Sequence, residues 1–222
     1  MFQPRSEHLR VTDMLNLLIA DDHSIVRRGL RQILDETPDL KVGGEATNGR
    51  EVMEKIRARS WDALVLDLAM PGSNGLDVLK QVKEHSPSLP VLILSMHEQD
   101  QYAGRALKAG ASGYLPKESA PEELVNAIRR ICAGGKYLTV EQVLKLGCLA
   151  QNAEERLPHE SLSDREFQVL RRIASGKAVS QIGVEMKLSV KTVSTYRMRL
   201  LEKMRLKNNA ELTHYGIKNG LV

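Results

Sequence analysis

Five side chains that can bind a metal ion or a phosphoryl group follow short hydrophobic runs of the sequence. They are Asp21, Asp22, Asp67, Ser95 and Lys117. Each run has the composition of a buried strand, and ligands of open α/β sheets bind at the carboxyl ends of the strands. We therefore expect three carboxylates, one hydroxyl and one ammonium to meet at one edge of a sheet. Any one of these residues alone would be read as an ordinary turn or surface residue.

Three carboxylates brought together need a cation, because each negative charge raises the pKa of its neighbours. A set of oxygen ligands indicates Mg²⁺, which also accepts water and phosphate oxygens. An ion of this kind favours in-line attack of a carboxylate oxygen on phosphorus. Asp67 ends its own strand and is the predicted nucleophile.

The elements that must position these residues are five strands that alternate with five helices. Hydrophobic runs predict strands over 15–20, 41–46, 63–68, 91–95 and 113–115, and helical spacing predicts helices over 24–36, 50–60, 75–85, 100–109 and 121–133. Nearly continuous hydrophobic strands are typical of a parallel sheet covered on both faces. This α/β order predicts a doubly wound, flavodoxin-like (βα)5 domain.

The C-terminal part is predicted to be a second, small all-α domain. Ser163 and Glu166 have the spacing of a capping box, and further helices are expected over 178–187, from 189 or 190 onward, and over 209–218. We place a disordered extension at 1–14, the α/β domain at 15–135, a helix over 139–149 and a linker within 136–160, and the helical domain at 161–222.

Charge is distributed unevenly between these parts. The net charge is +4, with 42% hydrophobic and 27% charged residues, which is typical of a globular chain. Residues 158–222 hold twelve lysines and arginines against six acids, whereas residues 1–157 hold twenty against twenty-two. This basic C-terminal part suits a polyphosphate partner, although charge runs are more often solvated faces.

The chain lacks the sequence features of an exported or membrane protein. No hydrophobic stretch approaches the roughly 18 residues of a membrane span, and no signal peptide is recognisable. The two cysteines, Cys132 and Cys148, have no metal-ligand spacing and are read as reduced thiols. We expect a cytoplasmic protein that has no membrane partner.

Four motifs of the first domain resemble the receiver domain of two-component response regulators. They are IADDH at 19–23, LDLAMPG at 66–72, LSMH at 94–97 and GASGYLPK at 110–117. The resemblance implies that Asp67 accepts a phosphoryl group from a sensor histidine kinase or phosphotransfer protein. It implies Mg²⁺ ligands at Asp21, Asp22, Asp67 and the carbonyl of Ala69, and switch residues at Ser95, Tyr114 and Lys117.

Residues 162–204 resemble the LuxR-type helix-turn-helix domain of the NarL/FixJ-like regulators. A helical wheel of the third helix places Val193, Leu200 and Met204 on one side, and Lys191, Thr195 and Met198 away from them. The resemblance implies base-edge contacts from Lys191, Thr192 and Thr195, and phosphate contacts from Tyr196, Arg197 and Arg199. Without the receiver domain, a packing helix with a solvated side would be the default interpretation.

Together these features predict a DNA-binding transcriptional regulator, not an enzyme beyond its own phosphorylation and dephosphorylation. Its expected partners are promoter DNA, RNA polymerase and a second copy of the chain when phosphorylated. Two alternatives stay open: a DNA binder whose receiver only dimerises, and a phosphatase, although the latter needs an acid where Ala69 stands. Phosphorylation would either uncover residues 191–199 or expose a dimer surface.

Overall fold

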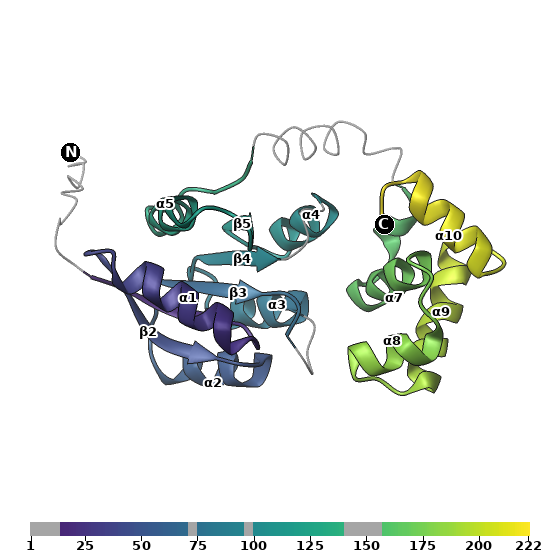
Figure 1. Ribbon diagram of the computed structural model, residues 1–222, viewed down its shortest axis with the longest axis horizontal. Coiled ribbons are helices and arrows are strands. Elements are labelled where there is room, and N and C mark those ends of the chain that lie inside the picture. The colour runs from purple at the N-terminus through teal and green to yellow at the C-terminus, as the bar shows by residue number, and fades with distance from the viewer. Residues whose placement is uncertain (1–13, 71–74, 96–99, 140–156) are drawn as a thin grey trace, which may run out of the picture.

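The computed structural model describes residues 14–70, 75–95, 100–139 and 157–222. Its first part is a parallel sheet of five strands in the order β2-β1-β3-β4-β5 (Figure 1). The strands are β1 (Leu15–Ala20), β2 (Leu40–Ala46), β3 (Ala63–Asp67), β4 (Val91–Ser95) and β5 (Gly113–Pro116). This order confirms the predicted flavodoxin-like fold.

Five helices cover the two faces of the sheet. They are α1 (Ser24–Asp35), α2 (Gly49–Ala58), α3 (Gly75–His85), α4 (Asp100–Lys108) and α5 (Pro121–Cys132). Alternate residues of β1 divide between two hydrophobic clusters, because neighbouring side chains of a strand point to opposite faces. Leu17 and Ile19 pack with α1 and α5, whereas Leu18 and Ala20 pack with α2, α3 and α4. The predicted elements are confirmed, with ends that differ by one or two residues.

The C-terminal part is helical, as predicted. It consists of a 3₁₀ helix η1 (Pro158–Ser161) and the helices α7 (Asp164–Ala174), α8 (Val179–Met186), α9 (Val190–Met204) and α10 (Asn209–Lys218). The predicted capping box is present: Ser163 Oγ accepts from Glu166 N, and Glu166 Oε2 accepts from Ser163 N at 2.8 Å. Phe167, Leu170 and Ile173 of α7 are buried inward, also as predicted.

The connection between the two parts was predicted only in part. The region expected to be linker ends in the 3₁₀ helix η1, where His159 is buried and its Nδ1 lies 2.7 Å from Tyr215 Oη. The helix expected over 139–149 lies almost wholly outside the described residues, as do Cys148 and residues 1–13. None of the described helices is long and apolar enough to span a bilayer.

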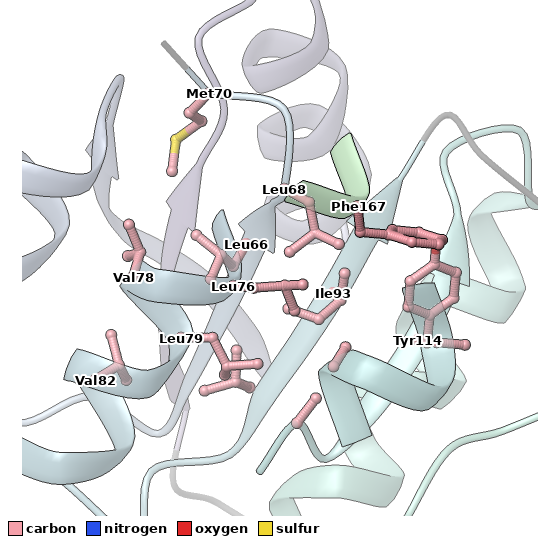
Figure 2. Packing of buried hydrophobic residues seen from close by; sticks show 14 of the residues in the cluster. Leu66, Leu68, Met70, Leu76, Val78, Leu79, Val82, Ile93, Tyr114 and Phe167 are labelled. Carbon is pink, nitrogen blue, oxygen red and sulfur yellow. The ribbon is translucent and has the colours of Figure 1, made fainter. Parts of the chain in front are cut away.

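One hydrophobic cluster runs from the sheet into the helical part. Leu68, Ile93 and Tyr114 of the first part belong to the same buried cluster as Phe167 of α7. Figure 2 shows the Phe167 ring next to the Tyr114 ring, with Leu68 and Ile93 beside them. The two parts are therefore packed against each other through apolar side chains.

Candidate functional site

The predicted cluster of polar residues lies at the carboxyl edge of the sheet. Asp67 is the last residue of β3, Ser95 is the last residue of β4, and Asp21 and Lys117 directly follow β1 and β5. The parallel register brings these ends together, and the backbone N–H of Lys117 donates to the carbonyl of Ser95 at 2.9 Å. Asp21, Asp67 and Ser95 are at most 4% exposed.

Lys117 connects two of the buried acids. Its Nζ lies 2.5 Å from Asp21 Oδ2 and 2.8 Å from Asp67 Oδ2. Burial lowers the pKa of Lys117, but the hydrogen bonds that it donates to the two carboxylates, together with their negative charges, outweigh burial, so that the pKa is raised overall. The amine is therefore held in its charged form between Asp21 and Asp67.

For Asp67, in contrast to Lys117, burial determines the direction of the pKa shift. Removal from water raises the pKa of this carboxyl, and the nearby Asp21 adds to the rise. The Lys117 ammonium and the N–H of Ala69, which donates to Asp67 Oδ1 at 3.0 Å, oppose the rise without cancelling it. Two buried acids share one ammonium here, so the site has an excess of negative charge.

The acids at this edge fit a divalent cation. Ligand atoms of Asp21, Asp22, His23 and Asp67 lie within 4.8 Å of one another. Asp22 Oδ1 is buried without a hydrogen-bond partner in the described part of the chain, although His23 Nδ1 is 3.0 Å away. A buried carboxylate oxygen that accepts no hydrogen bond is the kind of atom that a bound cation satisfies.

His23 was not among the predicted site residues. Its backbone N–H donates to Asp21 Oδ1 at 2.7 Å, and its Nδ1 lies 3.3 Å from the same atom. His23 therefore orients the Asp21 carboxylate that also binds Lys117. The signal in the sequence was its place directly after the acidic pair, but the residue type suggested no oxygen-ligand role.

The other predicted switch and ligand residues lie close to this edge in the fold. Tyr114 of β5 is fully buried and pairs with Ile93 of β4. Ala69 follows β3 by two residues and contributes its N–H to Asp67. The metal-ligand role of the Ala69 carbonyl stays a prediction.

The predicted DNA-contact residues on α9 differ in their exposure and in their hydrogen bonds within the protein. Lys191 and Arg199 are exposed. Thr195 Oγ1 donates to the carbonyl of Lys191 at 3.0 Å, and Arg197 Nε donates to Asn209 Oδ1 at 2.5 Å. Tyr196 is half-buried and packs against the core.

Thr192 belongs to the start of α9. Its backbone N–H donates to Ser189 Oγ, which caps the helix, and the two hydroxyl oxygens lie 2.8 Å apart. Three of the six predicted DNA-contact residues, Thr192, Thr195 and Arg197, thus already make hydrogen bonds within the protein. The helical wheel did not predict these hydrogen bonds, because it shows only on which side of the helix a residue lies.

Several exposed residues of α9 were absent from the predicted contacts. Ser194 is exposed, and the side chain of Met198, four residues later, is 62% exposed. Val190, four residues before Ser194, is 53% exposed. The helical wheel had turned Met198 outward, and an outward methionine on a basic helix was the signal that the sequence analysis left unused.

Comparisons with known proteins cover both parts of the chain. The family described as "Response regulator receiver domain" matches residues 17–129, and the family described as "Bacterial regulatory proteins, luxR family" matches residues 160–216. "Response regulator UvrY" of Escherichia coli K12 is 35% identical over 94% of this chain and 96% of that protein. "Response regulator GacA" of Pseudomonas aeruginosa is 33% identical over 94% and 98%.

Solved structures agree with these relatives. RcsB from Salmonella enterica serovar Typhimurium, bound to promoter P1flhDC in the presence of the phosphomimetic BeF3-, has a TM-score of 0.62 and 28% identity. The match covers 91% of this chain and 98% of that one. The likeness extends over both parts of the chain.

Proposed function

The chain belongs to the two-component response regulators with a receiver domain and a LuxR-type DNA-binding domain, and we propose that phosphorylation of Asp67 controls its binding to promoter DNA. Regulators of this family control transcription in two-component systems. The observation that carries the proposal is the buried Asp67 carboxylate, held by Lys117 beside a second buried acid at the end of the sheet.

The phosphoryl donor is the phosphohistidine of a sensor kinase or phosphotransfer protein. A carboxylate oxygen of Asp67 attacks phosphorus in line, the oxygen–phosphorus bond forms, and the histidine nitrogen leaves with the electron pair of the broken bond. Asp21, Asp22 and the Ala69 carbonyl would hold Mg²⁺, which neutralises charge on the transferred group. Lys117 keeps one Asp67 oxygen oriented, and the Ala69 N–H keeps the other.

Phosphorylation changes the partners of the surrounding side chains. The group brings about two negative charges and three acceptor oxygens. Ser95 would donate a charge-assisted hydrogen bond of about 1.5–3 kcal/mol to the phosphoryl group, and Lys117 would exchange a carboxylate oxygen of Asp67 for a phosphoryl oxygen. Changing the ratio of inactive to active protein from 99:1 to 1:99 takes about 5.5 kcal/mol. The Ser95 hydrogen bond supplies only part of this free energy, so a change in the packing around Tyr114 must supply the rest.

The DNA-binding part of the proposal rests on the open side of α9. The exposed Lys191 is the base-edge contact best supported by its surroundings, and Arg199 contacts the phosphate backbone. Thr192, Thr195, Tyr196 and Arg197 are proposed as further contacts. The hydrogen bonds of Thr192, Thr195 and Arg197 within the protein also fix the geometry of α9. Met198 is suited to a thymine methyl group.

The assembly on DNA is proposed to be a dimer that acts with RNA polymerase. A two-fold pair of helix-turn-helix domains binds two half-sites one helical turn apart. One solved relative is described as two RcsB dimers bound to two parallel DNAs, which supports the pairing.

The first test is chemical. Incubation with acetyl phosphate and Mg²⁺ should add one phosphoryl group to the wild-type chain and none to Asp67→Asn, as measured by intact mass and peptide mapping. Asp62→Asn is the matched control, because Asp62 is exposed near the opposite end of β3. An adduct that survives in Asp67→Asn would refute the assignment.

The second test is selection of DNA. Phosphorylated protein is mixed with a pool of random duplexes, and the retained sequences are determined. We expect a site with two related half-sites, and retention that falls when Asp67→Asn replaces the wild type. Retention of unrelated sequences by both proteins alike would contradict the proposal.

A further inference from the structure

We propose that Arg105 of α4 is an interdomain clamp that holds the DNA-binding domain on the unphosphorylated receiver while α9 stays open. This inference rests on the proposed function and concerns its regulation. The clamp fixes where the DNA-binding domain sits, and its release allows two such domains to pair on DNA.

The Arg105 guanidinium makes several contacts with the start of the DNA-binding domain. Its Nη1 donates to the carbonyl of Leu162 at 2.9 Å and to Asp164 Oδ1 at 3.1 Å. Its Nη2 donates to the carbonyl of His159 at 2.8 Å. The guanidinium carbon lies 4.2 Å from the centroid of the Phe167 ring. One receiver side chain thus binds both η1 and the first turns of α7.

Asp164 binds a second receiver cation. Lys80 of α3 places its Nζ 2.8 Å from Asp164 Oδ2, so each carboxylate oxygen has a cation from a different receiver helix. The side chains of Asp164 and Arg105 are only 10% and 17% exposed. Shielding from water makes such a pair stronger than an ordinary surface ion pair.

The clamp is connected to the phosphorylation site through packed side chains. Asp67 is followed by Leu68, which shares a buried cluster with Tyr114 and Phe167. Figure 2 shows Phe167 beside Tyr114, the predicted switch residue. A change in the packing of Tyr114 on phosphorylation would therefore reach the ring on which Arg105 lies.

The described part of the receiver does not cover the side of α9 that carries Lys191, Met198 and Arg199. Lys191 and Arg199 are exposed, and Met198 is 62% exposed. Of the two mechanisms expected from the sequence, the covering of residues 191–199 therefore does not apply to Lys191, Met198 and Arg199 in the part of the chain that the structure describes. Release of the clamp changes the position of the domain and leaves its access to bases unaltered.

The experiment compares a two-half-site duplex, taken from the selected sequences, with the same duplex carrying one scrambled half-site. In the unphosphorylated protein, Arg105→Gln and Asp164→Asn should each raise affinity for the two-half-site duplex about tenfold, the size of one charge-assisted contact. Affinity for the single half-site should stay unchanged. Small-angle X-ray scattering should show a larger radius of gyration for both variants.

Two controls isolate the clamp. Lys108→Gln removes an exposed cation from the same helix and should change nothing. The double variant with Arg105→Gln and Asp164→Asn should gain much less than the product of the single gains, because both changes break one interaction. This comparison also removes the effect of losing an acid at the start of α7.

The outcomes separate the clamp from the proposed function. Equal gains in affinity for the single half-site would mean that the receiver covers α9. An unchanged radius of gyration would mean that Arg105 does not hold the DNA-binding domain on the receiver. Either result overturns the clamp. If phosphorylated wild type gains no affinity for the duplex, the proposed function fails, and the scattering of the Arg105 variant still decides the clamp.

Discussion

Replacement of Lys117 by methionine should destabilise the receiver by about 3–5 kcal/mol at neutral pH without added metal. Methionine matches the unbranched aliphatic part of the lysine side chain but lacks the ammonium that Asp21 and Asp67 share. All three side chains are nearly inaccessible to water, at 6%, 1% and 2% exposure. Removal of one partner from a buried ion pair typically costs about 3–5 kcal/mol, because the remaining charge is left uncompensated.

The assay is urea denaturation followed by the fluorescence of Trp61, the only tryptophan of the chain. It lies in the receiver, where its Nε1 donates to the carbonyl of Lys55 at 3.1 Å. Addition of Asp67→Asn to the methionine variant should recover much of the lost stability, because it removes one of the two buried carboxylates that no longer have a cation partner. Mg²⁺ should also reduce the loss, because the cation replaces the missing positive charge.

Two results would refute this reasoning. A loss below about 1 kcal/mol would mean that Lys117 is no more than a surface cation. A double variant as unstable as the single one would mean that the cost comes from packing of the aliphatic chain. Lys108→Met is the matched control, because Lys108 is exposed and should lose little stability.

Three further predictions concern the Asp67 carboxyl, the start of α7 and the exposed side of α9. The raised pKa of Asp67 means that the folded state keeps this proton to a higher pH than the unfolded state. The contribution of this group to the free energy of unfolding is therefore present below the unfolded pKa of about 3.9 and is lost as the pH rises through the folded pKa. Urea titrations of wild type and Asp67→Asn across this pH range should show stabilities that diverge in this way. Ser163→Ala removes the side-chain cap of α7 and should cost about 0.5–2 kcal/mol in thermal or urea unfolding, whereas Ser175→Ala, beyond the end of α7, should cost less. Lys191→Ala should weaken binding to the selected site by about 1–3 kcal/mol relative to random DNA, whereas Arg199→Ala should weaken all duplexes alike and flatten the salt dependence; identical effects in filter binding would contradict the two roles.

The sequence predicted the polar residues at the carboxyl edge of the sheet well because strand ends are easy to locate. A buried parallel strand is a short apolar run, and the first polar residue after it must lie at the carboxyl edge of the sheet. Asp21, Asp67, Ser95 and Lys117 were placed correctly on this basis. The bridging of two acids by Lys117 was not predicted, because periodicity does not give distances between strand ends.

Contacts between side chains of different helices were beyond the sequence analysis. Arg105 and Asp164 each look like solvated residues in their own helices, and only the packing of α4 against α7 makes them partners. The same limit applies to Arg197, whose hydrogen bond to Asn209 was not predicted. Hydrophobic periodicity reports which side of an element is buried, not which element covers it.

The position of Arg105 bears on how freely regulators of this design can exchange domains. A chimera that joined residues 157–222 to a foreign receiver would retain the capping box and the helical core of the C-terminal part. It would lose the contacts to His159, Leu162 and Asp164 unless the foreign fourth helix carried an arginine at the matching place. Such a hybrid would keep both folds and yet lose the clamp that we propose, so that a domain exchange between regulators must preserve the arginine as well as the two folds.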